Sequence, residues 1–200
     1  MHVLPQLAAH ASIARFLAYA RARPEQMFEV TRVGCGLAGY RDTDILPAFS
    51  GAPSNCVLPY TWRRLLDSRL PAHVIVAGSR AFNDFDFLHH ALQHLLARLP
   101  VVTIVSGAAR GADQLGERYA RQCGIDLIRV PADWNAYGKA VGMLRNQRMS
   151  WSASHLVAFW DSTSPGTRNM IDTATRDGLA VRVVRIRSAL QSLIPTPVNS

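Results

Sequence analysis

Hydrophobic and polar residues alternate along most of the chain with two different periods, which distinguish strands from helices. Short apolar runs rich in β-branched residues are typical of buried parallel strands, because neither face of such a strand meets water. Five of these runs lie at residues 73–79, 101–107, 125–131, 155–160 and 180–186. Between them, apolar residues recur every three or four positions, as in an amphipathic helix. The pattern predicts alternating strands and helices in this part of the chain.

Start and stop signals for helices fit this alternation. In residues 83–100, Asn83 or Asp84 can cap the first turn and Pro100 ends the helix. The remaining helices are predicted over residues 111–124, 137–153 and 166–178, with Gly124 as a stop signal. Strands and helices that alternate this closely form a parallel sheet with helices on both faces. The predicted fold is therefore α/β and Rossmann-like, with a five-stranded parallel sheet.

The first 70 residues show a different order of elements. The pattern predicts a helix over residues 7–24, a strand over 27–36, a short helix over 42–49 and a second strand over 54–59. Residues 59–73 have the character of a turn and linker. We therefore expect two domains, a small N-terminal extension of residues 1–70 and the Rossmann-like domain of residues 71–200.

Composition is that of a globular protein with an excess of positive charge. The 200 residues are 48% hydrophobic and 18% charged, and the formal net charge is +8. Nearly all of the positive charge is arginine, because Lys139 is the only lysine. A guanidinium group suits bidentate contacts to phosphate, so the charge favours a phosphate-bearing partner.

Cysteine usage indicates a reducing compartment. Cys35, Cys56 and Cys123 form no C-x-x-C motif and no disulfide framework, so we expect free thiols and a cytoplasmic location. We identify no leader peptide and no apolar run of membrane-spanning length, and we expect no membrane partner.

Small and polar residues follow four of the predicted strands, at the edge where open parallel sheets bind ligands. Small side chains let backbone amides approach a phosphate, and helices that begin near Gly111 and Gly166 direct N–H groups at an anion. The candidate ligand-binding residues at these strand ends are Gly78, Ser79, Arg80, Ser106, Gly107, Ala108, Arg110, Gly111, Asp113, Trp134, Ser164, Gly166 and Thr167. Trp134 either stacks on a base or packs against the following helix.

Two common nucleotide signatures are missing from the sequence. It contains no G-x-x-x-x-G-K-[ST] motif, and no G-x-G-x-x-G follows the first strand of the domain. We therefore expect neither P-loop hydrolysis of a nucleoside triphosphate nor conventional NAD chemistry, and we predict no cofactor and no metal site.

Four motifs, in this order, resemble the SLOG superfamily of Rossmann-like domains, in its YspA-like branch. The motifs are "GSR" (78–80), "SGAARGAD" (106–113), "ADWNAYGKAVGMLRNQRM" (132–149) and "SPGTRNMIDTA" (164–174). The resemblance implies a pocket for a nucleotide or nucleotide derivative built from these segments, with Arg145 and Asn146 as further ligand-binding residues. Related branches are the Lonely Guy phosphoribohydrolases, which release a base from a ribose monophosphate, and the DNA-processing protein A family, which binds single-stranded DNA.

One position departs from the phosphoribohydrolases. Arg145 falls where that branch has a catalytic arginine, but Asn169 stands where it has a glutamate. An amide cannot act as a general acid or base, which puts cleavage of an N-glycosidic bond in doubt. Asp172, further along the same predicted helix, is the candidate replacement. Arg145 and Asp172 are therefore the candidate catalytic residues, and whether the chain is an enzyme stays open.

The N-terminal extension has a resemblance of its own. Residues 24–59 resemble half of a macro-like, ADP-ribose-associated domain, and "GCGLAGY" (34–40) is similar to a phosphate-binding loop. With half a domain present, we expect the extension to pack on the main domain or at an interface between identical subunits. A homo-oligomer is the expected assembly.

Three hypotheses about function follow. In the first, the domain binds a nucleotide or nucleotide-derived small molecule, ADP-ribose-like in kind, as a sensor or processing module. The second is a single-stranded DNA-binding protein akin to DNA-processing protein A. The third is an N-glycosidic phosphoribohydrolase.

Overall fold

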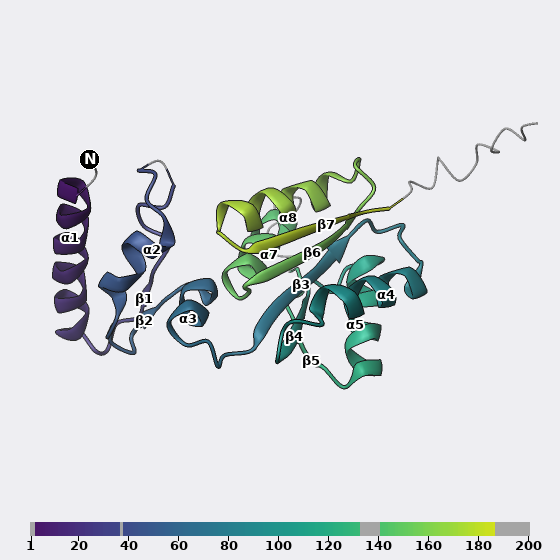
Figure 1. The fold of residues 1–200 in the computed structure, drawn as a ribbon, viewed down its shortest axis with the longest axis horizontal. Helices are drawn as coiled ribbons and strands as arrows, with labels where there is room; N and C mark the ends of the chain where they lie inside the picture. Colours follow the sequence, from purple (N-terminus) through teal and green to yellow (C-terminus); the bar gives the residue numbers. More distant parts are fainter. Residues whose placement is uncertain (1–2, 37, 133–140, 187–200) are drawn as a thin grey trace, which may run out of the picture. The chain divides into compact units, whose positions relative to one another are not determined.

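The computed structural model describes residues 3–36, 38–132 and 141–186. The chain divides into two compact units, Met1–Arg69 and Leu70–Ser200 (Figure 1). Each unit has its own hydrophobic core.

The N-terminal unit is mostly helical, with a small parallel sheet. Its elements are α1 (Val3–Arg21), β1 (Phe28–Glu29), α2 (Asp42–Ile45), the 3-10 helix η1 (Leu46–Phe49), β2 (Cys56–Val57) and α3 (Tyr60–Leu66). β1 and β2 pair in parallel over two residues each, so both strands are much shorter than the apolar runs suggested.

The prediction of a turn and linker over residues 59–73 was wrong for its first half, where α3 forms. Trp62 on this helix is fully buried, and its indole Nε1 donates to Oδ1 of Asp42 at 2.7 Å. Its ring packs on Phe49, with ring centroids 5.3 Å apart. The helix therefore forms because a large aromatic side chain completes the core of this unit.

The C-terminal unit contains one five-stranded parallel sheet. Its strands are β3 (Ala72–Gly78), β4 (Val102–Ser106), β5 (Asp126–Arg129), β6 (His155–Trp160) and β7 (Ala180–Arg185), in the order β5-β4-β3-β6-β7. This confirms the predicted fold class. After β5 the chain returns to the other side of β3, so the strand order reverses beside β3 and β6.

Helices cover both faces of the sheet (Figure 1). α4 (Phe85–Leu96) and α5 (Ala112–Cys123) cover one face, and α7 (Val141–Trp151) and α8 (Pro165–Arg176) cover the other. Alternate residues of β3 serve the two cores: Val74 and Val76 belong to the α4–α5 side, Ile75 and Ala77 to the α7–α8 side. Burial on both faces explains why the strand reads as a continuous apolar run.

Local signals fix where the helices of this unit begin and end. Of the two candidate caps of α4, Asp84 is the one used, because its Oδ1 accepts from the Phe87 amide at 2.9 Å. Gly124 ends α5 in the left-handed conformation, with φ of 63°. Within the described residues, no helix is long and apolar enough to span a bilayer.

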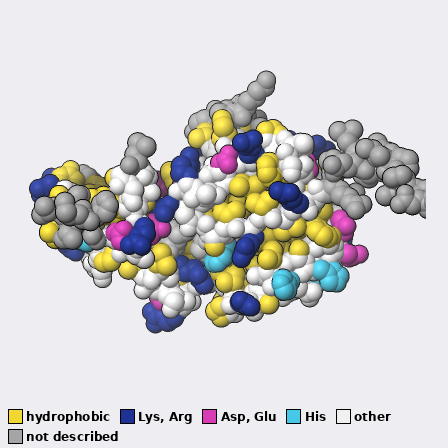
Figure 2. Space-filling view, turned by 45° about the horizontal axis from the view of Figure 1, so that its top comes forward, with side chains coloured by type: hydrophobic (Ala, Val, Ile, Leu, Met, Phe, Trp, Pro, Cys, Tyr) yellow, Lys and Arg dark blue, Asp and Glu magenta, His cyan; other side chains and the backbone are white. Residues whose placement is uncertain are grey.

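Positive charge is dispersed on the face of the molecule shown in Figure 2. In the view of Figure 2, arginine side chains lie apart from one another, with apolar and uncharged surface between them. On this face the arginines do not form a continuous basic stripe.

Candidate functional site

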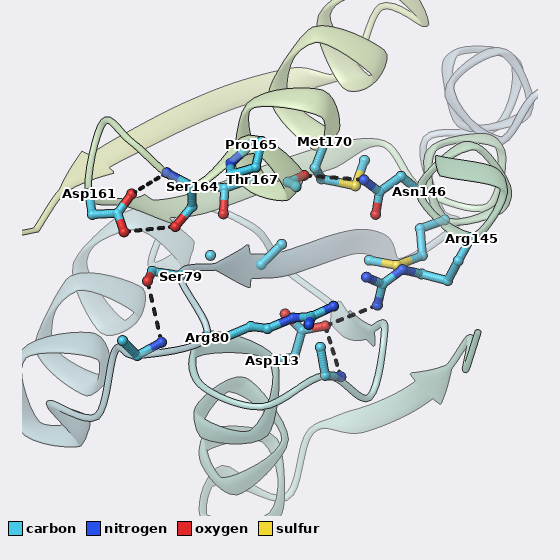
Figure 3. Close-up of a pocket in the computed structure, with 16 residues that line it drawn as sticks. Ser79, Arg80, Asp113, Arg145, Asn146, Asp161, Ser164, Pro165, Thr167 and Met170 are labelled. Atoms are coloured by element: carbon cyan, nitrogen blue, oxygen red, sulfur yellow. Dashed lines mark hydrogen bonds and ion pairs between the residues drawn. The ribbon is translucent and has the colours of Figure 1, made fainter. Parts of the chain in front are cut away.

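A cavity of about 540 Å³ opens at the carboxyl edge of the sheet, where the strand order reverses. The end of β3, the start of α5, the helix α7 and the segment that leads into α8 supply its walls (Figure 3). Open parallel sheets bind ligands at this position, and small-molecule sites have volumes of about 300–1,000 Å³. Nine predicted site residues line it: Gly78, Ser79, Arg80, Asp113, Arg145, Asn146, Ser164, Gly166 and Thr167.

A second cavity of about 340 Å³ lies beside the first, over the loop between β4 and α5. Gly107, Ala108 and Arg110 from the predicted set line this second cavity. Arg80 and Arg145 line both cavities and therefore belong to the wall that they share.

Among the described residues, two of the predicted set, Ser106 and Gly111, fall outside both cavities. Ser106 is fully buried, and its hydroxyl donates to Oε1 of Glu117 at 2.9 Å. Gly111 has φ of 79°, and a Cβ there would collide with the carbonyl oxygen of Ser79. The glycine is thus required by conformation and packing, before any ligand is considered. Trp134 lies outside the described residues.

Arg145 and Asp113 form a buried ion pair at the wall between the cavities. Nη1 of Arg145 donates to the carbonyl oxygen of Gly107 at 2.6 Å and lies 3.4 Å from Oδ2 of Asp113. The side chains are 14% and 5% exposed, respectively. Burial raises the pKa of Asp113 to about 6, even though Arg145 and two backbone amides oppose the shift. Burial also lowers the pKa of Arg145, with a further contribution from the charge of Arg80.

Three amides of the loop after β4 have hydrogen-bond partners inside the protein. Gly107 and Ala109 donate to Oδ2 of Asp113 at 3.1 and 3.4 Å, and Ala108 donates to Oγ of Ser106 at 3.0 Å. These three amides are therefore held by Asp113 and Ser106 in the structure and do not point to a free phosphate site. The side chains of Arg80 and Arg145 line the cavity beside this part of the loop.

Asp161 organises the entrance to α8. Its Oδ1 accepts from the amides of Thr163 at 3.0 Å and Ser164 at 2.7 Å, and its Oδ2 accepts from the Ser164 hydroxyl at 2.7 Å. Burial would raise the pKa of Asp161, but the hydrogen bonds from Ser164 and Thr163 hold it well below its usual value. The carboxylate is therefore charged at neutral pH.

Sequence reasoning missed Asp161 as a residue of the site, although it lines the first cavity. A signal was present: an aspartate directly after a strand, followed three residues later by a serine, is typical of a side chain that caps the next turn. Met149 and Met170, which add apolar surface to the cavity, carried no such signal, because their spacing is that of ordinary core residues.

The candidate catalytic carboxylate is not in the site. Asp172 is 69% exposed and lies 3.9 Å from Nε of Arg168, so the structure does not bring it to Arg145 and the candidate pair is corrected. The buried Met170 lines the cavity, and two positions along a helix turn the side chain about 200° away from that face.

Asn169, the position that departs from the phosphoribohydrolases, takes part in a contact between two helices. Nδ2 of Asn146 on α7 donates to Oδ1 of Asn169 on α8 at 2.8 Å and to the carbonyl oxygen of Gly166 at 3.3 Å. Asn146 is buried and lines the cavity, whereas Asn169 is not among the lining residues.

The fold and the site define a class of protein: an α/β domain with a polar cavity at the point where the strand order of its parallel sheet reverses. The model of the YspA, cpYpsA-related SLOG family matches residues 72–137. The Gene 61 protein of Mycobacterium phage D29 is 36% identical over 115 residues, which are 54% of this chain and 92% of that protein. The chain belongs to the YspA, cpYpsA-related SLOG family. The match lies outside residues 24–59, whose macro-like resemblance stays a prediction.

Two solved structures are similar to the chain. DNA processing protein A from Streptococcus pneumoniae aligns with a TM-score of 0.48 and 21% identity, over 62% of this chain and 53% of that one. DNA processing protein A from Helicobacter pylori, described with a single-stranded DNA binding mode, aligns with a TM-score of 0.47 and 18% identity, over 63% and 70%. The chain thus spans about half the length of the first of these proteins.

Proposed function

We propose that the C-terminal unit binds a nucleotide or nucleotide-derived small molecule at the carboxyl edge of its sheet. The observation that carries the proposal is the convergence of Arg80 and Arg145 on the wall of a cavity of about 540 Å³. Two guanidinium groups can hold a phosphate through charge-assisted hydrogen bonds. We place the phosphate of the ligand against these two arginines.

The rest of the first cavity suits a nucleoside. Asp161 is a carboxylate on the cavity wall that accepts from Thr163 and Ser164 and also interacts with the Ser79 side chain. A ribose hydroxyl can compete with the Ser79 side chain for this acceptor. Met149 and Met170 supply polarizable apolar surface for a base.

Further donors come from the first turn of α8. The N–H groups at the start of a helix have no partner within it, and the Ser164 side chain makes no capping bond to α8. Gly166 and Thr167, which line the cavity, therefore offer N–H groups to a ligand hydroxyl or phosphate.

Binding without base release is the proposal we favour. Asn169 has no charge, and Asp172 points to the surface. The two carboxylates that line the cavity are engaged: Asp113 with the loop amides, Asp161 with Ser164 and Thr163. An oxocarbenium-like transition state needs a carboxylate free to assist it.

A small ligand is also favoured over single-stranded DNA, the second hypothesis. The net charge of +8 suits either partner. A protein that tracks a nucleic-acid backbone presents its basic residues as a patch or stripe, whereas the arginines on the face shown in Figure 2 are scattered.

Thermal denaturation with a ligand panel tests the proposal. A ligand that binds only the folded state must raise the melting temperature. We expect stabilisation by at least one member of a panel of nucleoside mono- and diphosphates and ADP-ribose, and less by an oligothymidylate at physiological salt. Arg80→Gln should lose most of the shift, measured against its own ligand-free value. Arg121→Gln, which changes an exposed arginine of α5, is the matched control. A panel without effect at millimolar ligand contradicts the proposal.

A further inference from the structure

We infer that the second cavity is a subsite for an additional phosphoryl group, so that the ligand class is a nucleotide with a diphosphate or longer phosphate chain. The inference rests on the proposed function, because it needs the nucleoside to occupy the first cavity. The inference adds one property to the proposed function: the site prefers ligands with two or more phosphoryl groups over ligands with one.

Continuity of the two cavities is the first observation. Arg80, Ala109 and Arg145 line both, so the cavities meet at a common wall rather than at separate parts of the surface. A ligand phosphate held by the two arginines therefore lies at the junction. A group attached to that phosphate can extend into the second cavity, whose volume of about 340 Å³ exceeds what one phosphoryl group needs.

The charges of the two cavities differ, and this is the second observation. In the first cavity, Asp113 and Asp161 lie among the lining residues together with the two arginines. The charged side chains that line the second cavity are three arginines, Arg80, Arg110 and Arg145, without a carboxylate among the described lining residues. The first cavity therefore suits the neutral, hydroxyl-bearing nucleoside, and the second suits an anion.

Arg110 is the residue that belongs to the second cavity alone. Its side chain is exposed, and the described residues give it no hydrogen bond and no ion pair. The amides of Gly107 and Ala109 beside it are already bound to Asp113. The guanidinium group of Arg110 is therefore the side-chain donor that this cavity adds for a second phosphoryl group.

Titration calorimetry of the full chain with AMP and with ADP tests the inference, with GMP and GDP as a second pair. We expect the diphosphate to bind at least about tenfold more tightly than the monophosphate, as one charge-assisted hydrogen bond allows. Arg110→Gln should remove most of this ratio by weakening the diphosphate about tenfold and the monophosphate less than twofold. Arg121→Gln has the same change in charge on an exposed position of α5 and should leave the ratio unchanged.

Two results overturn the inference and can be told apart. Equal affinities for mono- and diphosphate, or an equal loss of both in Arg110→Gln, reject the second subsite and leave the nucleotide-binding proposal standing. Failure of every nucleotide to bind the wild-type chain rejects the proposed function and the subsite together.

Discussion

Asp113 joins the loop after β4 to α7, and the local geometry of the site depends on this carboxylate. It accepts from the amides of Gly107 and Ala109 and lies beside the guanidinium group of Arg145. A buried charge needs such partners, because transfer from water to the protein interior is costly. The same burial that orders the loop therefore keeps the carboxyl group easy to protonate.

The raised pKa of Asp113 predicts how stability changes with pH. Between the ordinary value of 3.8 and about 6, the folded state holds a proton that the unfolded state has released. The contribution of Asp113 to the free energy of unfolding therefore falls as pH rises through this window, and then stays constant. Urea denaturation from pH 4 to 7.5 measures it as the difference between wild type and Asp113→Asn.

Asp172→Asn is the matched control for this measurement, because Asp172 is 69% exposed. The variant removes one negative charge at an exposed position, as Asp113→Asn does at a buried one. A wild-type advantage over Asp113→Asn that grows with pH in that window contradicts the assignment of a raised pKa.

At the residue scale, the sequence predicted which residues lie at the site more accurately than it predicted what each residue does there. Small residues after predicted strands marked Gly78, Ser79 and Arg80, which line the first cavity. Gly111 was assigned to phosphate contact, yet its conformation and its packing against Ser79 already require glycine. Position after a strand can be predicted from local pattern, whereas the direction of a side chain depends on neighbours from distant parts of the chain.

At the scale of elements, the link between α7 and α8 sets one wall of the cavity. Asn146 is buried on α7 and donates to Asn169 and to Gly166 on α8. These bonds hold the start of α8, where Gly166 and Thr167 face the cavity, at a fixed place against α7.

Removing the Asn146 amide should therefore loosen this wall. Asn146→Ala leaves the carbonyl of Gly166 and the Asn169 amide without their donor, and we expect a loss of about 1–2 kcal/mol in the free energy of unfolding. Chemical denaturation measures the loss. Asn169→Asp keeps an oxygen acceptor for Asn146 and should cost less than half as much. Equal costs for the two variants contradict the role given to this bond.

Some helices and strands could be predicted from the sequence, and others could not. The alternating strands and helices of the C-terminal unit were found because burial on both faces leaves long apolar runs in the sequence. The helix α3 was missed, because its formation depends on Trp62 entering a core built from segments far away in sequence. Asp172 was named as a candidate catalytic residue for a related reason, since the sequence pattern alone did not say which face of α8 meets the cavity.

At the scale of the whole molecule, some arginines are scattered over the surface view of Figure 2 and others gather at one cavity. The net charge is +8, and the arginines in Figure 2 are scattered singly. Against this diffuse background, three arginines converge on one cavity at the sheet edge. A scattered charge attracts many anions weakly and is screened by salt, whereas convergent guanidinium groups bind one phosphate chain with defined geometry.

Chemical-shift mapping of backbone amides by NMR, with ADP added to the full chain, tests the central claim most directly. The measurement reports where the ligand binds as well as whether it binds. We predict saturable shifts at the end of β3 and the start of α8, at Gly78, Ser79, Arg80, Gly166 and Thr167, which all line the first cavity. Unchanged amides at these positions under millimolar ADP, or shifts confined to helices remote from the carboxyl edge such as α4, contradict the account.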